Sequence, residues 1–337
     1  MRPAFLNTLI CPVCNQALTL TTLSETAEGN VESGLLRCPC NAWYPIIGFV
    51  PRMLVGDLRP DYSDFLRNHA SELEPMGLEG VERSDATSHN VIRTRESFGF
   101  EWSEFARFGW EEAEEETLDL ADRNTHAQEH LMAHTKLTFR RKTLLTPAQL
   151  EGRRVLDVGC GNGRYAHVAA GCGAEVVGID LSRAVDVASA NTRNDPAIQI
   201  VQADVFNLPF REASFDVIYS IGVLHHTPSA RDAFRTLVPR LRPSGTISIH
   251  LYHEGNPVWE CVDALLRHVT TLLPLRPLWY GLYAFTALGK LAFLNRYSYA
   301  AVNALIRAQP VHHHNFDWYS APIASHHKGE EVENWFR

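Results

Sequence analysis

Residues 153–166 read Arg-Arg-Val-Leu-Asp-Val-Gly-Cys-Gly-Asn-Gly-Arg-Tyr-Ala, and residues 175–182 read Glu-Val-Val-Gly-Ile-Asp-Leu-Ser. The apolar run at 155–158 predicts a buried strand, three alternating glycines follow it, and a helix is expected from Arg164. Residues 175–179 predict a second strand, which ends in Asp180. Glycines after a strand allow a tight turn and let a ligand approach the main chain. A carboxylate at the tip of the next strand can accept hydrogen bonds from both hydroxyls of a ribose, so the stretch predicts a nucleoside site.

The spacing of the glycines indicates which kind of nucleoside. The dinucleotide fingerprint has its third glycine three residues after the second, whereas Gly159, Gly161 and Gly163 alternate here. Three more motifs follow in order, at residues 202–204 (Gln-Ala-Asp), 215–220 (Phe-Asp-Val-Ile-Tyr-Ser) and 241–246 (Leu-Arg-Pro-Ser-Gly-Thr). Over residues 150–255 this series resembles the class I S-adenosylmethionine-dependent methyltransferases.

The resemblance implies a Rossmann-like, doubly wound α/β sheet and S-adenosylmethionine as cofactor. It implies that Asp157 faces the amino-acid end of the cofactor, directly or through water, that Asp180 holds the ribose, and that Asp204 meets the adenine edge. Ser220 and Ile221 are expected on the sulfur side. The full set of implied cofactor-binding residues is Asp157, Gly159, Gly161, Gly163, Asp180, Leu181, Asp204, Val205, Ser220 and Ile221.

Composition narrows the function classes. The chain has 337 residues, 45% of them apolar, which is enough for a sizeable core and predicts about two domains. Its net charge of −8 provides no overall basic field for nucleic acid, although a local basic patch is compatible with it. The first residues lack the apolar stretch of a signal peptide, and the cysteine usage favours a metal site in a reducing compartment. We therefore expect a cytoplasmic protein.

Residues 1–56 differ from the rest and predict a small metal-binding domain. Cys11 and Cys14 form one close pair, and Cys38 and Cys40 form a second pair after 23 residues. Two such pairs on two turns supply four thiolates to one tetrahedral zinc ion. The segment resembles the zinc ribbons of activator subunits of RNA methyltransferases and of some bacterial methyltransferases. It departs from them in the Cys-x-Cys second pair, and metal binding is expected to compensate for a small core.

Residues 57–148 are expected to form a linker and helical lid segment. Residues 95–102 (Arg-Glu-Ser-Phe-Gly-Phe-Glu-Trp) resemble a segment of methyltransferases that carry a similar front domain. Closing over the cofactor and packing of a linker on the core are both compatible with this segment. From residue 126 to 146 the apolar spacing predicts a helix that Pro147 ends.

Residues 149–337 are expected to form the methyltransferase domain, with a helical insert at 256–310. Three interpretations of the apolar insert stay open: a cap over the substrate pocket, plain packing, or contact with a membrane surface. Residues 278–294 are nearly uncharged but shorter than the roughly 20 residues of a membrane span. The tail at 312–322 resembles a phrase that lies near the substrate in the same methyltransferases, and we expect it to cover the pocket with the insert.

The last residues, 330–337, look like the start of a helix that leads to two final strands in the family. No strand pair follows, so the sheet is expected to stop at a strand over 246–252 unless the insert supplies another. A naturally short chain and a truncated one both fit this ending.

A general base is not identified by the sequence. His226, after the fourth strand, and Tyr252 and His253, after the fifth, are the candidates for taking a proton from the substrate, and a purely structural role stays open for the histidine after the fourth strand. The leading hypothesis is methyl transfer to a small, apolar metabolite. The alternatives are an RNA methyltransferase that binds rRNA or tRNA through the ribbon, and a non-catalytic scaffold. Oligomeric state is not indicated.

Overall fold

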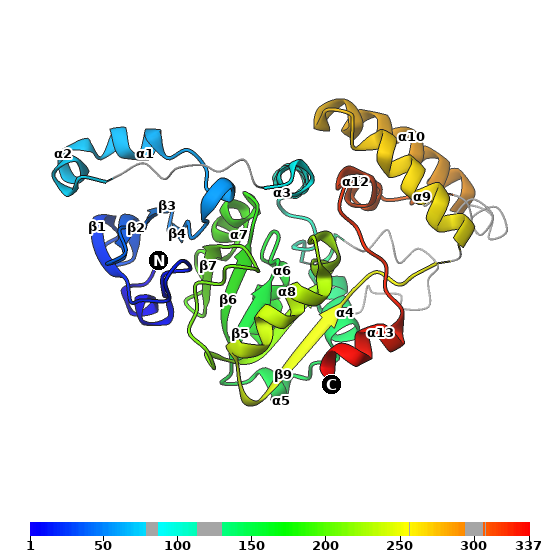
Figure 1. Cartoon of the computed structure of the whole chain (residues 1–337). Coiled ribbons are helices and arrows are strands. Elements are labelled where there is room, and N and C mark those ends of the chain that lie inside the picture. The colour runs from blue at the N-terminus through cyan, green and yellow to red at the C-terminus, as the bar shows by residue number, and fades with distance from the viewer. Residues whose placement is uncertain (79–86, 113–129, 256, 294–305, 307) are drawn as a thin grey trace.

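A five-stranded parallel sheet forms the centre of the molecule (Figure 1). The computed structural model describes residues 1–78, 87–112, 130–255, 257–293, 306 and 308–337. The strand order is β7-β6-β5-β8-β9. The strands are β5 (Arg154–Val158), β6 (Glu175–Asp180), β7 (Ile198–Gln202), β8 (Phe215–Ile221) and β9 (Leu241–His250). The chain winds one way from β5 to β7 and the other way through β8 and β9, so the predicted doubly wound, Rossmann-like fold is confirmed.

Helices cover both faces of the sheet, because buried side chains alternate along the strands. Val155 and Val176 pack with one set of helices, while Leu156 and Val177 point to the other face. The first set is α4 (Met132–Thr143), α6 (Arg164–Gly171) and α7 (Ala184–Thr192). The second face carries α8 (Ala230–Leu237), flanked by the short turns η6 (Leu224–His226) and η7 (Val238–Arg240).

The N-terminal unit is a four-stranded antiparallel sheet that shares its core with the central sheet. Its elements are η1 (Pro3–Thr8), β1 (Thr19–Glu25), β2 (Val31–Arg37), β3 (Trp43–Ile47) and β4 (Val50–Pro51). Leu9 and Tyr44 belong to the same buried cluster as Leu156 and Phe210. The Met53 N–H donates to the carbonyl oxygen of Gln202, at the edge strand β7 (2.8 Å). This small unit therefore completes its core against the larger domain.

The connecting segment carries short helices and one long helix that approaches the sheet. These are η2 (Gly56–Leu58), α1 (Ser63–Asn68), α2 (Ala70–Leu73), η3 (Glu74–Met76), α3 (His89–Glu104) and α5 (Pro147–Leu150). The predicted helix end at Pro147 is wrong. Helix α4 ends at Thr143, because the next residue, Leu144, has a left-handed φ of 58°, and Pro147 instead begins α5 after the Thr146 capping box.

The described part of the chain after β9 forms helices and adds no strand to the sheet. These helices are α9 (Pro257–Thr270), α10 (Leu275–Phe293), α12 (His312–Ser320), α13 (Gly329–Glu333) and the short η8 (Asn334–Phe336). Within the described part of the insert no strand joins the sheet, so the sheet stops at its fifth strand as expected. That strand begins earlier than predicted, because Leu241 already pairs with Phe215 across a bulge, and it ends at His250. Residues 294–305 of the expected insert lie outside the described residues.

Candidate functional site

A cavity of about 480 Å³ lies at the carboxyl ends of β5, β6 and β8. Parallel sheets of this kind bind ligands at that edge, where the strand order reverses. The volume is within the roughly 300–1,000 Å³ that is typical of small-molecule sites. The cavity brings together the glycine loop, the tips of three strands, α3 and α12.

The loop after β5 exposes its backbone to the cavity. Gly159 and Gly161 both line the cavity and have positive φ values of 79° and 53°. A Cβ on Gly159 would approach a Val223 methyl to 2.2 Å, and one on Gly161 would approach the Trp102 ring to 2.8 Å. Both positions therefore require glycine for backbone conformation and for space.

Two carboxylates at strand tips face the cavity. Asp180 accepts hydrogen bonds from the Gly161 N–H (3.1 Å) and from the Ser182 N–H (2.8 Å) and hydroxyl (2.7 Å), which fixes its side chain beside the loop. Asp204 accepts from the Phe206 N–H (3.2 Å) and the Asn207 amide (2.9 Å). Burial raises the pKa of both carboxyl groups, and the hydrogen bonds oppose this rise.

Seven of the ten implied cofactor-binding residues line the cavity: Gly159, Gly161, Asp180, Leu181, Asp204, Val205 and Ile221. The other three lie behind it. Asp157 is buried under the loop, where burial raises its pKa to about 7. The Ser220 hydroxyl donates to the Val158 carbonyl oxygen (3.1 Å), and Gly163 caps the start of α6. These three residues are positioned to support the loop and strands rather than to touch a ligand directly.

Helices α3 and α12 close the cavity over the glycine loop, and they contact one another (Figure 1). Phe98 and Trp102 of α3 and His313 and Asp317 of α12 line it. The His313 ring stacks on Phe108 with ring centres 4.4 Å apart, and its Nε2 lies 3.1 Å from a carboxylate oxygen of the buried Glu101. The structure thus supports a lid role for the aromatic segment at 95–102 and for the tail.

The expected cap by residues 256–310 is wrong for the described part of that insert. None of its described residues is among those that line the cavity. Helices α9 and α10 pack instead on the far side of α12, through a cluster that includes Trp259, Leu278, Leu282 and Phe316. One apolar side of the insert therefore supports the lid helix from outside.

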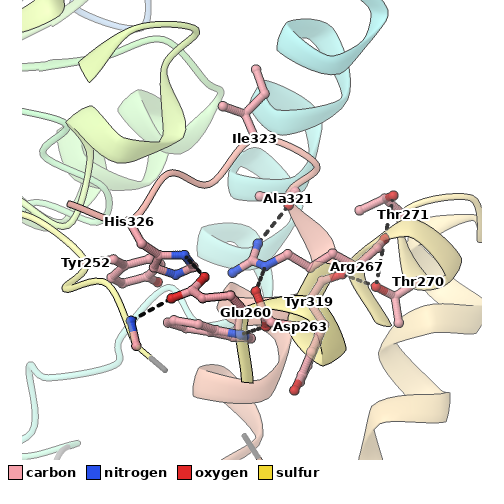
Figure 2. A network of polar contacts seen from close by, with 12 residues as sticks. Tyr252, Glu260, Asp263, Arg267, Thr270, Thr271, Tyr319, Ala321, Ile323 and His326 are labelled. Atoms are coloured by element: carbon pink, nitrogen blue, oxygen red, sulfur yellow. Dashed lines mark hydrogen bonds and ion pairs between the residues drawn. The ribbon is translucent and has the colours of Figure 1, made fainter. Parts of the chain in front are cut away.

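Hydrogen bonds and an ion pair connect α9 with α12 and with the segment that follows α12 (Figure 2). The Arg267 Nε lies 2.8 Å from Asp263, and its guanidinium donates to the Ala321 carbonyl oxygen (3.1 Å). Asp263 also accepts from the Trp318 indole, and Thr270 donates to the Tyr319 carbonyl oxygen (2.7 Å). Arg267 and Asp263 are both almost fully buried, so this pair anchors the insert within protein rather than at the surface.

Two of the three candidate bases, His226 and Tyr252, line the cavity. The Nδ1 of His226 lies 2.6 Å from the Ile323 carbonyl oxygen, so Nδ1 carries the proton and donates, and Nε2 is left with a lone pair. Nε2 is buried and has no hydrogen-bond partner among the described residues. Tyr252 also lines the cavity, but its hydroxyl donates to Asp317 (2.9 Å). His253 is exposed and does not line the cavity, so it is excluded as a base.

Burial, the largest effect, lowers the pKa of His226 to about 4, with Asp317 opposing the shift. The unfolded chain binds this proton near pH 6.5, so His226 costs stability as the pH falls from about 6.5 to about 4. We predict that acidification from neutral pH to about 4 lowers the unfolding free energy of the wild type by roughly 2–3 kcal/mol more than that of His226→Gln. Denaturant titration at several pH values measures this difference, and identical slopes for the two proteins would contradict a buried neutral imidazole.

The four N-terminal cysteines converge at one end of the small sheet. The sulfur atoms of Cys11, Cys14, Cys38 and Cys40 all lie within 4.8 Å of one another. Cys11 and Cys40 are 3.8 Å apart, and Cys14 and Cys38 are 3.2 Å apart. A tetrahedral zinc ion with Zn–S bonds of about 2.3 Å separates its sulfur ligands by about 3.8 Å. The donor set therefore fits zinc, including the Cys-x-Cys pair.

Sequence reasoning missed several cavity residues, among them Thr94, Lys142, Phe206 and His250. They come from helices, loops and strand ends with no motif of their own, and only the fold brings them together. Asn162 stands inside the glycine loop and could have been noticed there. It donates to the Phe108 carbonyl oxygen (2.9 Å) and ties the loop to the segment after α3.

Residues 156–249 match the family model of the methyltransferase domain. A tRNA U34 carboxymethyltransferase of Trichlorobacter lovleyi is 36% identical over 148 residues, which are 41% of this chain and 46% of that protein. A 27-O-demethylrifamycin SV methyltransferase of Amycolatopsis mediterranei is 33% identical over 154 residues, 44% of this chain and 51% of that protein. The solved S-adenosylmethionine dependent methyltransferase from Mesorhizobium loti is 31% identical, with a TM-score of 0.32 over 36% of this chain and 53% of that chain. The chain thus spans about half the length of these relatives.

Proposed function

We propose that this chain, which carries a class I S-adenosylmethionine-dependent methyltransferase domain, transfers a methyl group to a small, apolar acceptor held beneath α3 and α12. The observation that carries the proposal is one cavity that both Asp180 and His226 line. The bound cofactor supplies a methyl group on a positively charged sulfur, and the protein supplies position and electrostatics.

The residues at the cavity fit this cofactor. The Asp180 carboxylate is held by three protein donors and stays open to the cavity, so its remaining lone pairs are available to ribose hydroxyls. Gly159 and Gly161 leave room for the ligand against the backbone. Asp204, Leu181 and Val205 would border the adenine, and Ile221 would lie near the sulfur.

His226 would accept the proton, or the hydrogen bond, of the acceptor group. Its Nδ1–H donates to the Ile323 carbonyl oxygen, which fixes the tautomer and leaves a lone pair on Nε2, and the His226 side chain lines the cavity. Because burial lowers its pKa to about 4, the imidazole is neutral at physiological pH. A base this weak suits an acidic nucleophile, such as a phenol or a thiol, better than an alcohol.

The side chains of α3 and α12 above the glycine loop favour a small acceptor. Phe98 and Trp102 on α3 and His313 on α12 narrow the space above the glycine loop. An RNA acceptor would have to reach this space with one flipped base, and the net charge of −8 gives no general attraction for RNA. The relative from Trichlorobacter lovleyi carries a tRNA name, so RNA belongs in the test as the competing substrate.

Methyl transfer from radiolabelled S-adenosylmethionine tests the proposal directly. The protein is incubated with a panel of apolar phenols, thiols and hydroxylated metabolites, and separately with bulk tRNA and rRNA. We expect label in the small-molecule fraction, and the His226→Gln protein should lose most of that turnover. Label that enters RNA alone would overturn the proposed substrate class, and no transfer to either class would favour the scaffold reading.

We also propose that Cys11, Cys14, Cys38 and Cys40 hold one zinc ion. All four sulfurs lie within the reach of a single ion, and the two turns that carry them sit at one end of a small sheet. Because the small unit also shares the cluster of Leu9, Tyr44 and Phe210 with the larger domain, zinc would fix the two turns rather than supply the whole core.

Purified protein should contain about one zinc ion per chain. The double variant Cys11→Ser, Cys38→Ser should lose it, because two of the four thiolates are removed. The matched control is Cys172→Ser, Cys261→Ser, which removes two cysteines outside the cluster and should keep the metal. Elemental analysis by mass spectrometry measures the content, and full zinc retention in the first variant would refute the assignment.

A further inference from the structure

The insert exposes many large apolar side chains. Of the thirteen large hydrophobic residues that are exposed in the described part of the chain, nine lie between residues 258 and 291. Leu272, Tyr280 and Leu291 are 73%, 72% and 68% exposed. Exposed apolar residues scattered singly need no explanation, but a concentration of this kind marks an interaction surface. We define the hairpin face by Val258, Leu265, Leu272, Tyr280, Leu288 and Leu291.

Both helices of the insert have two apolar sides, and only one is used inside the molecule. Trp259 on α9 and Leu278 and Leu282 on α10 are buried against Phe316 and Tyr319 of α12. Val258 and Leu265 on α9 are seven residues apart, and Tyr280 and Leu288 on α10 are eight apart, so each pair lies about two turns apart on one side of its helix. Leu272 lies in the connection between the two helices. In Figure 1, α9 and α10 form the outer end of the molecule, opposite the N-terminal sheet.

The charges around the hairpin face have one sign. Arg276 and Lys290, near the two ends of α10, are exposed. The acids of the same helices point elsewhere, since Asp263 is buried with Arg267 and Glu260 pairs with His326 (2.8 Å). Within the described part of the insert, therefore, no Asp or Glu side chain is exposed. This is notable in a chain whose net charge is −8.

We propose that the hairpin face lies on the surface of an anionic lipid bilayer. An apolar face with flanking cations matches the acyl chains and the charged headgroups at once. Tyr280 is exposed, and tyrosine is favoured at the level of the headgroups. A second copy packed face to face would instead bring Arg276 and Lys290 toward the same cations, with no acid from the hairpin to pair them.

The helices would lie along the surface rather than cross it. Among the described residues, none of the helices is both long and apolar enough to span a membrane. The other side of each helix is also occupied by α12, which keeps the insert attached to the domain.

Co-sedimentation with vesicles tests the proposal on the full chain without cofactor, so the result is independent of methyl transfer. The vesicles contain phosphatidylcholine with phosphatidylglycerol, or phosphatidylcholine alone. We expect the wild type to pellet with the mixed vesicles. The variant Leu272→Asp, Leu291→Asp should bind at least about tenfold more weakly, because two leucine side chains no longer insert.

Two further variants separate the causes. Arg276→Ser, Lys290→Ser should weaken binding to the mixed vesicles by about fivefold per cation and leave binding to phosphatidylcholine unchanged. Leu144→Asp makes the same change at an exposed leucine at the end of α4 and should bind as the wild type does. All variants are first shown to keep the wild-type melting temperature and helix content.

Three results would overturn the proposal. The first is a wild type that stays in the supernatant with both kinds of vesicle. The second is equal vesicle binding by the wild type and Leu272→Asp, Leu291→Asp. The third is a stable dimer, detected by light scattering without lipid and abolished by that same variant, which would assign the hairpin face to a second copy.

Discussion

Replacing Arg267 by methionine should lower the free energy of unfolding by about 3–5 kcal/mol. The substitution leaves Asp263 buried without its cation and removes the donor to the Ala321 carbonyl oxygen. An uncompensated buried charge is far more costly than a lost surface contact, because it can neither regain water nor find another partner. Denaturant titration, followed by circular dichroism, measures the loss.

The matched control is Arg276→Met on α10. Arg276 is exposed, so the same change there should alter the unfolding free energy by less than about 0.5 kcal/mol. The double variant Asp263→Leu, Arg267→Met removes both charges and should recover part of the loss, although the Trp318 indole then loses its acceptor. Equal stability of Arg267→Met and the wild type would contradict a buried pair that anchors α9 to α12.

Replacing Asp180 by alanine should weaken the binding of S-adenosylmethionine by about a hundredfold or more. Two charge-assisted hydrogen bonds to ribose hydroxyls contribute roughly 1.5–3 kcal/mol each, and the variant loses both. The carboxylate also accepts from the Gly161 N–H, so its loss loosens the loop on which the ligand would lie. Titration calorimetry of both proteins gives the ratio of affinities.

Asp180→Asn serves as the intermediate variant, because its amide oxygen still accepts a hydrogen bond. Its affinity for S-adenosylmethionine should fall between those of the wild type and Asp180→Ala. Asp232→Ala, which removes an exposed acid on α8, should bind as the wild type does. Wild-type affinity in Asp180→Ala, with an unchanged melting temperature, would exclude the proposed ribose contact.

The central part of the fold could be predicted because its signals are local in the sequence. The strand at residues 154–158, the glycine loop and the strand that ends in Asp180 are consecutive, and each has a pattern that physical reasoning can interpret alone. The same holds for the cysteine pairs, whose spacing within two turns already indicates convergence. The seven predicted residues that line the cavity all lie at the loop or at strand ends.

The lid and the insert could not be assigned in the same way, because their contacts join distant parts of the chain. His226 depends on Ile323, and Trp102 meets His313, across separations that no local pattern encodes. The apolar content of α9 and α10 was correctly identified, but a sequence does not say which of two apolar sides faces the protein. His253 is wrong as a candidate because its side chain is exposed, whereas that of the preceding Tyr252 lines the cavity.

Titration of the wild-type protein with S-adenosylmethionine, and with NAD as the competing nucleotide, tests the central claim most directly. The cavity that contains Gly159, Gly161 and Asp180 should bind one S-adenosylmethionine per chain, and S-adenosylhomocysteine should compete for the same site. NAD should give no heat of binding in the same experiment. Tight binding of NAD, or no heat with either sulfur compound, would contradict the account.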